Sequence, residues 1–391
     1  MKSIIKFIFL TVFIFLFANA FTLDYGGTLS NSTGIKGAFN ALELDQNNKA
    51  TLWLKSPFNE SQNMYFAAEG SYKFSYTGGN NNIITNELEL GLFKFSMILP
   101  MENNSRIRLD IGRISAFDTT SLIFAQSSDG AQFAISTPKF VCSVLASYTG
   151  LLSAHSYTYF GYNYTYNNNI LYPLAQKFFI VDALIKLPTL FAKQDLTAEF
   201  LGFFSGEKAV SDYHRMYATL GLNGGIAKNL FYIFSTTFGF NTSNDPYKGF
   251  SNLSNFELSY YPSFMSSSFA WITTYASGNS DNGLKRFMPF NKIAPDISGH
   301  KAYSGLFKTG FMATIQPITN FLLVAATDLF FISDPESGTS FGLDGFQWSF
   351  NARWQILSDI QLSLIAGQFL PLINSTSDAD FFATLKLVIS F

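Results

Sequence analysis

The sequence predicts an all-β fold, namely a closed antiparallel β-barrel of about 18 strands that crosses a membrane, with 16 strands as the alternative count. Charged residues make up 13% of the chain and apolar residues 48%, whereas soluble domains are usually about a quarter charged. Many segments alternate apolar and polar residues with a period of two, which is the pattern of a strand. After the first twenty residues, no run of about 18 apolar residues predicts a membrane-spanning helix.

Residues 1–20 have the pattern of a secretory signal peptide. Lys2 and Lys6 form a positive start, residues 8–17 an almost entirely apolar run, and Ala18 and Ala20 a small-residue cleavage site. We therefore expect a signal peptide at 1–20 and a barrel domain at 21–391.

The segment 345–357 shows the strand pattern most clearly. One face is aromatic and aliphatic, while the intervening residues are all polar. A strand of about ten residues with one face suited to lipid and one to water is typical of a membrane-spanning barrel. The apolar face comprises Phe346, Trp348, Phe350, Ala352, Trp354 and Ile356.

The same reading along the chain predicts 18 strands, or 16 if the second and sixth are merged into their neighbours. The predicted strands are 22–31, 50–56, 64–77, 84–99, 105–115, 131–137, 139–151, 176–188, 194–206, 213–226, 229–241, 254–264, 267–277, 303–316, 320–332, 345–357, 359–371 and 380–391.

From the third strand onward, the connections alternate between short and long. Transmembrane barrels have short periplasmic turns and longer extracellular loops, so an even strand count places both termini on the periplasmic side. The first and last strands should pair, because a lipid-exposed sheet edge would leave backbone groups without hydrogen bonds.

The last strand, 380–391, carries apolar residues at alternate positions and ends on an aromatic residue. This strand, the alternating strand pattern and the loop asymmetry together resemble those of a Gram-negative outer-membrane β-barrel of the porin type. The resemblance implies an outer-membrane location, lipid and the barrel-assembly machinery as partners, and a C-terminal assembly signal; it leaves a homotrimer open. The signal would comprise Phe381, Leu385, Leu387, Ile389 and Phe391.

Charged residues recur on the polar faces of successive early strands. They predict either a charged pore lining, whose signs bias the passage of ions and solutes, or ion pairs that brace the wall. The candidates are Lys55, Glu69, Lys73, Glu87, Glu89, Arg106, Arg108 and Asp110, with Arg353 on a later strand.

The third loop, 116–130, lies in a passage similar to the strand-to-loop segment of several substrate-specific porins. If it folds inward, Phe117, Asp118, Phe124 and Asp129 would narrow and line the pore; the alternative is an ordinary outer loop. Arg113 lies out of phase with its strand, which indicates either a bulge or an interfacial position.

Other motifs carry little signal for catalysis. Cys142 is the only cysteine, and the three histidines are far apart, so we expect neither metal, cofactor nor enzyme activity. The weakly acidic composition argues against nucleic acid as a partner. A tyrosine-rich fourth loop predicts either loop packing or contact with sugars or a protein; it contains Tyr157, Tyr159, Tyr162, Tyr164, Tyr166 and Tyr172.

The leading hypothesis is therefore a channel for diffusion of ions or small hydrophilic solutes. Two alternatives stay open. One is a structural or surface-interaction barrel with a closed pore. The other is a transporter for hydrophobic compounds, suggested by Phe93, Leu201 and Phe382 at positions expected to face the lumen.

Overall fold

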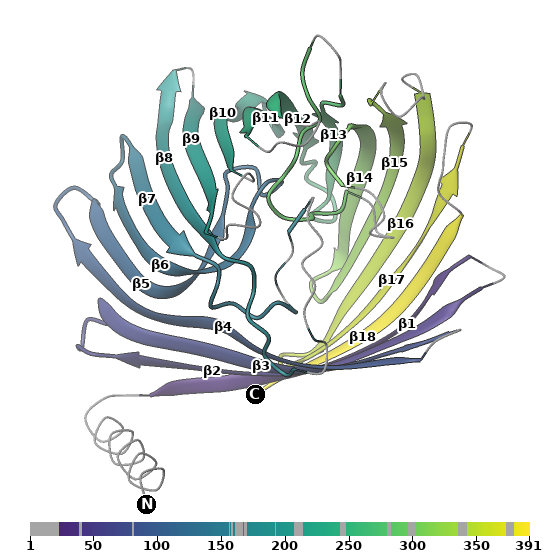
Figure 1. Cartoon of the computed structure of the whole chain (residues 1–391), viewed down its shortest axis with the longest axis horizontal. Helices are drawn as coiled ribbons and strands as arrows, with labels where there is room; N and C mark the ends of the chain where they lie inside the picture. Colours follow the sequence, from purple (N-terminus) through teal and green to yellow (C-terminus); the bar gives the residue numbers. More distant parts are fainter. Residues whose placement is uncertain are drawn as a thin grey trace, which may run out of the picture.

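The computed structural model contains one 18-stranded antiparallel sheet that closes on itself through β1 and β18 (Figure 1). No helix among the described residues is long and apolar enough to cross a membrane. The structure describes residues 23–38, 41–79, 82–155, 157, 159–160, 167, 170–191, 193–206, 214–242, 248–279, 283–295, 302–334, 342–372 and 379–391.

Each strand pairs with its neighbours in sequence, and the predicted count of 18 and the closed barrel are confirmed. The strands are β1 (Asp24–Gly37), β2 (Glu43–Pro57), β3 (Met64–Gly78), β4 (Ile83–Pro100), β5 (Arg106–Phe117), β6 (Ala125–Ser136), β7 (Val141–Tyr148), β8 (Phe178–Phe191), β9 (Gln194–Ser205), β10 (Arg215–Ala227), β11 (Leu230–Asn241), β12 (Gly249–Tyr260), β13 (Ser268–Ala276), β14 (Leu306–Ile318), β15 (Phe321–Ile332), β16 (Gly342–Leu357), β17 (Ile360–Pro371) and β18 (Asp380–Ser390).

The largest differences from the predicted bounds are in β1, β2 and β6. β2 begins at Glu43, whereas the predicted strand begins at residue 50. The prediction missed the first part of β2 because Gln46 and Asn48 share its outward face with Leu52 and Leu54. A polar outward face interrupts the alternation that identifies a strand, although the backbone pairing with β1 and β3 continues.

The two ends of the barrel differ, as the alternating connections predict. The short-turn end carries turns such as 137–140, 228–229, 319–320 and 358–359, and the long-loop end carries the long connections between β7 and β8 and between β13 and β14. The connections between β1 and β2 and between β3 and β4 are exceptions, since both are short but lie at the long-loop end.

Alternate residues of each strand face the lumen and the outside. In β9 and β10, Leu201, Phe203 and Tyr217 are buried inside, whereas Phe200 and Leu220 are exposed outside. Many large apolar residues are exposed on the outer face around the barrel, as a lipid-facing surface requires.

A β-bulge reverses the expected orientation of Phe93. The register between β3 and β4 shifts at Glu69 and Gly70, so Phe93 lies on the outer face, where its ring contacts Phe66 edge-on. The expectation that Phe93 faces the lumen is therefore wrong, because the bulge adds one residue to β4. Leu201 and Phe382 do share the inner face, as the registers of their strands show.

The β5–β6 hairpin leaves the barrel wall at a pair of glycines. Gly112 and Gly130 face each other across the two strands. Gly112 has a φ of +121°, and a Cβ there would lie 2.2 Å from the carbonyl oxygen of Phe93. Only glycine fits this conformation and approach. Beyond this level, in the described residues, β4 pairs with β5 only over 93–100, and β6 pairs with β7 only over 129–136.

A loop segment fills the resulting opening in the wall. We define the wall panel as residues 149–155 and 170–177. The amide of Leu88 in β4 donates to the carbonyl of Leu171, and the amide of Thr149 donates to that of Phe178 at the start of β8. Leu151 and Leu174 are exposed on one side of the panel, whereas Leu152 and Ala175 are buried on the other. The panel therefore continues the two-faced wall without strand ladders on either side.

Candidate functional site

The tip of the β5–β6 hairpin, 118–124, lies inside the barrel. Asp118 is buried, and its carboxylate accepts hydrogen bonds from the amides of Thr120, Ile123 and Phe124 at 2.7–3.0 Å. The amide of Thr119 donates to both carboxylate oxygens of Glu199 in β9, at 3.0 Å each. The tip is thus closed by its own aspartate and fixed to β9.

A second segment crosses the lumen and binds the hairpin. We define the lumen strap as residues 283–295 of the connection between β13 and β14. The amides of Phe290 and Asn291 both donate to the carbonyl of Ile123, at 3.1 and 2.9 Å. The side chain of Asn291 also accepts from the amide of Ala125 and donates to Gln126. Hairpin and strap therefore form one unit.

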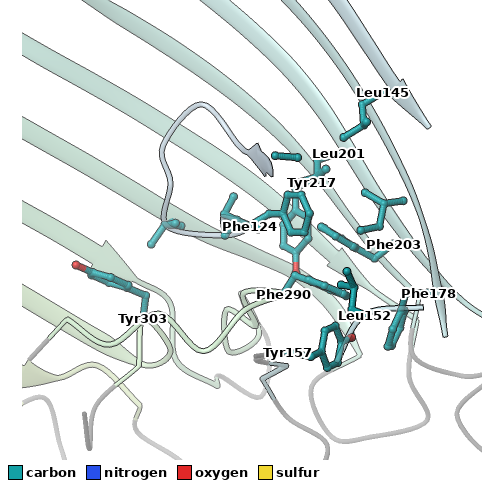
Figure 2. Close-up of a cluster of buried hydrophobic side chains, with 14 of the residues drawn as sticks. Phe124, Leu145, Leu152, Tyr157, Phe178, Leu201, Phe203, Tyr217, Phe290 and Tyr303 are labelled. Atoms are coloured by element: carbon teal, nitrogen blue, oxygen red, sulfur yellow. The ribbon is translucent and has the colours of Figure 1, made fainter. Parts of the chain in front are cut away.

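Aromatic residues fill the space between this unit and the wall (Figure 2). Phe290 stacks on Phe203 of β9 with ring centroids 3.8 Å apart, and Phe124 meets both rings at angles near 60°. We call the set the lumen cluster. Its buried members are Ile114, Ala116, Ile123, Phe124, Leu145, Leu152, Tyr157, Ala175, Phe178, Ile180, Leu201, Phe203, Tyr217, Leu253, Ala276, Phe287, Phe290 and Tyr303.

Two polar side chains of β10 hold the lumen strap against the wall. Arg215 donates from Nη1 to the carbonyl of Pro289 at 2.6 Å, and the hydroxyl of Tyr217 donates to the carbonyl of Met288. The guanidinium also lies 4.8 Å from the ring centre of Tyr159. Since Arg215 is 1% exposed, this buried charge is costly to separate from its partners, and it favours the docked position of the strap.

Acidic residues lie beside the hairpin tip. Asp118, Asp182 and Glu199 are all buried, and Asp182 lies in register with Leu201 in the neighbouring strand. Among the described residues, no group of three histidine, cysteine or acidic side chains could hold a metal ion.

The charged residues predicted to line the pore share the inner face of β2 to β5. Lys73 pairs with Glu87 at 3.4 Å, Lys49 with Glu89 at 4.0 Å, and Arg108 with Asp110 at 2.8 Å. Lys94 also contacts Asp110 at 3.5 Å. The same residues therefore lie on the lumen face and brace the wall, so the two predicted roles are compatible.

The remaining candidates of this set lie on the same face. The Lys55 ammonium is 4.9 Å from the ring centre of Tyr65, and Glu69 lies opposite Trp53. Arg106 lies opposite Pro100 near the short-turn end. In the later strands, Arg353 of β16 and Lys386 of β18 lie on either side of Ser363 of β17 in register, on the inner wall.

The four candidates of the third loop do not stay together. Asp118 and Phe124 are buried inside the lumen, but Phe117 is 60% exposed. Asp129 lies on the side of the hairpin that faces the wall panel, where it forms an ion pair with Arg113 at 2.7 Å. The expectation that Asp129 joins the pore lining is therefore corrected: the hairpin bends inward at Gly112 and Gly130, which turns this face toward the opening in the wall.

Residues far along the chain complete the site and were not predicted. The lumen strap and Arg215 carry no local motif. Apolar residues on the inner face, such as Leu201 and Phe203, were the one sequence signal that a segment packs inside the barrel, because a water-filled lumen would favour polar residues there.

The tyrosines of the predicted fourth loop have different positions. Tyr157 and Tyr159 pack in or against the lumen cluster, and Tyr172 binds Arg113. Tyr162, Tyr164 and Tyr166 lie outside the described residues.

Solved structures of similar fold include several proteins from Pseudomonas aeruginosa. OccK5 (OpdH) aligns with a TM-score of 0.62 at 11% identity, covering 94% of this chain and 98% of that one. OccK2 (OpdF) gives 0.63 at 10% identity, covering 94% and 97%. The outer membrane protein OprD gives 0.57 at 9% identity, covering 94% and 93%. The chain therefore has the fold of a porin-type outer-membrane barrel. No protein-family model and no curated protein matches the sequence.

The predicted assembly signal lies on the outer face of the closing strand. Leu385, Leu387 and Ile389 are exposed outside, and Phe381 shares their side of β18. The backbone of Phe391 exchanges two hydrogen bonds with Gly27, at 2.9 and 3.0 Å. The last residue thus extends the pairing that closes the barrel.

Proposed function

We propose that the protein is an outer-membrane channel that selects small hydrophilic solutes by a constriction inside its lumen. The observation that carries this proposal is the hairpin tip joined to the lumen strap by Ile123 and Asn291. A barrel of 18 strands is wide enough for an aqueous pore, so an element that crosses it controls what passes. Above and below the constriction, the early strands supply a polar, charged wall.

The same proposal includes the setting of the barrel. Both termini lie on the periplasmic side, the apolar outer face contacts lipid, and Phe381, Leu385, Leu387, Ile389 and Phe391 act as the signal for the barrel-assembly machinery. We propose no catalytic role, metal or cofactor. Native mass spectrometry of the purified protein decides between a monomer and the homotrimer left open by the sequence.

Conductance across planar bilayers tests the channel. We expect discrete, stable conductance steps from the folded protein. A folded barrel without conductance would instead support the structural alternative with a closed pore. OccK2 (OpdF) has been crystallised with glucuronate, so acidic sugars are suitable first solutes for liposome-swelling assays with this chain.

Charge reversal tests the lining. We expect Arg106→Glu with Arg108→Glu to shift the permeability ratio toward cations, because both side chains lie on the inner face near the short-turn end. Lys139→Glu is the matched control, since Lys139 is exposed in the short turn 137–140. An unchanged ratio in the double variant would assign these arginines to bracing alone.

The lumen cluster favours a second candidate, the transport of hydrophobic compounds. Its buried side chains form an apolar surface inside the barrel that a purely aqueous channel does not need. Competition by a neutral aromatic compound such as phenol against the swelling rate of a neutral sugar distinguishes the two. Competition supports passage along the cluster, and equal rates support the hydrophilic channel.

A further inference from the structure

A cavity of about 270 Å³ lies in the opening of the barrel wall beside β4. Its lining combines lumen-facing Glu89 with outward-facing Leu90 of the same strand, Phe117 and Gln126 of the hairpin, and Leu152 of the wall panel. In β4 only residues 93–100 pair with β5, so the cavity lies against the part of the β4 edge that the wall panel covers.

The opening lies near one boundary of the membrane. β4 and β5 remain paired over eight residues, 93–100 with 106–113, and a spanning strand needs about 9–11 residues. Irregular backbone facing lipid is not tolerated within the hydrocarbon region, so the wall panel belongs at the interfacial level. Molecules with a polar head and an apolar chain lie at the same depth, with the head toward water and the chain toward the hydrocarbon.

The polar lining limits the charge of a bound head group. All five N–H groups of Arg113 are occupied by Asp129, Leu90, Tyr172 and Leu151, so this arginine has no donor left for an anion. Glu89 adds negative charge. Its carboxylate can accept a hydrogen bond from a hydroxyl group.

We propose that this wall cavity binds a neutral single-chain amphiphile with a hydroxyl head group, which enters from the membrane past the wall panel. The hydroxyl of the head donates to Glu89, and the chain lies against Leu90, Phe117 and Leu152. This site is separate from the constriction of the proposed channel, because it lies on the opposite side of the hairpin from Asp118.

Photolabelling locates the binding site. The probe is a decanol that carries a diazirine in its chain, added to the folded barrel in detergent. We expect saturable labelling of peptides from 83–92, 113–129 and 149–177, reduced by excess decanol. Ser115→Trp, which fills the cavity, should lower this labelling at least tenfold. Non-saturable labelling spread over the outer face, or unchanged labelling in Ser115→Trp, would overturn the proposal.

A crosslink tests entry past the wall panel. In a Cys142→Ser background, Leu88→Cys and Leu171→Cys are joined after folding by a short bifunctional thiol reagent; their backbones are already hydrogen-bonded. Phe133→Cys with Val144→Cys, outward partners of β6 and β7, is the matched control. We expect only the first crosslink to abolish labelling. Equal labelling in both would refute lateral entry. Single-channel conductance of the same variants is measured in parallel. It tests the channel proposal independently, because the labelling result does not depend on whether the pore conducts.

Discussion

Arg113 and Asp129 form a bidentate ion pair on the outward side of the β5–β6 hairpin. Nε and Nη2 of the arginine donate to the two carboxylate oxygens at 2.8 and 2.7 Å. Nη1 donates to the carbonyl of Leu90 and to the hydroxyl of Tyr172, and Nη2 also donates to the carbonyl of Leu151. One side chain thus joins the hairpin, β4 and the wall panel.

Removing this ion pair should loosen the wall panel. We expect Arg113→Met to destabilise the barrel by about 3–5 kcal/mol, because it leaves a carboxylate without its partner and breaks hydrogen bonds to two carbonyls. Limited proteolysis should then cleave within 149–177 first, and urea unfolding measures the loss. Lys36→Met, which breaks a more exposed ion pair with Asp45, should cost about 1 kcal/mol or less. Equal effects of the two variants would contradict this account.

Gly112→Ala should prevent the hairpin from leaving the wall. The added Cβ would lie 2.2 Å from the carbonyl oxygen of Phe93, at a φ of +121°, so we expect a loss of about 1–3 kcal/mol or more. Heat-modified mobility on gels and urea unfolding measure it. Gly225→Ala is the control, since the nearest atom there is 3.6 Å away and belongs to a Phe231 ring; it should be close to neutral.

Phe290→Ala should widen the constriction. The ring is fully buried against Phe203, and its removal leaves space that water can fill. We expect a higher single-channel conductance together with a stability loss of up to about 3–5 kcal/mol. Phe250→Ala, at an exposed position on the outer face, should leave conductance unchanged. A Phe290 variant that folds with the wild-type conductance would show that the pore runs elsewhere.

Removal of Phe391 should impair assembly more than conductance. Its backbone exchanges two hydrogen bonds with Gly27, but the residue lies at the short-turn end, away from the lumen cluster. We expect less folded protein in the outer membrane and normal conductance steps from the fraction that folds. Normal insertion of the truncated chain would remove the assembly signal from the proposal and leave only the strand.

The sequence by itself determined the strands and their order. Alternation with a period of two is a local property, so residues such as Phe346 and Trp348 identify a lipid-facing strand without reference to distant partners. The strand count followed in the same way. Prediction failed where local pattern and pairing differ: at β2, whose outward face is partly polar, and at Phe93, where a bulge in the pairing with β3 reverses the orientation.

Only the tertiary structure decided what lies inside the barrel. Phe290 and Phe203, Asn291 and Ala125, and Arg215 and Pro289 meet across long stretches of sequence, and their contacts exist only after the wall has closed. The same holds for Arg113, whose partners come from β4, β6 and the wall panel. Local alternation specifies which face of a strand a residue occupies, whereas the path of a loop through the lumen depends on packing between distant residues.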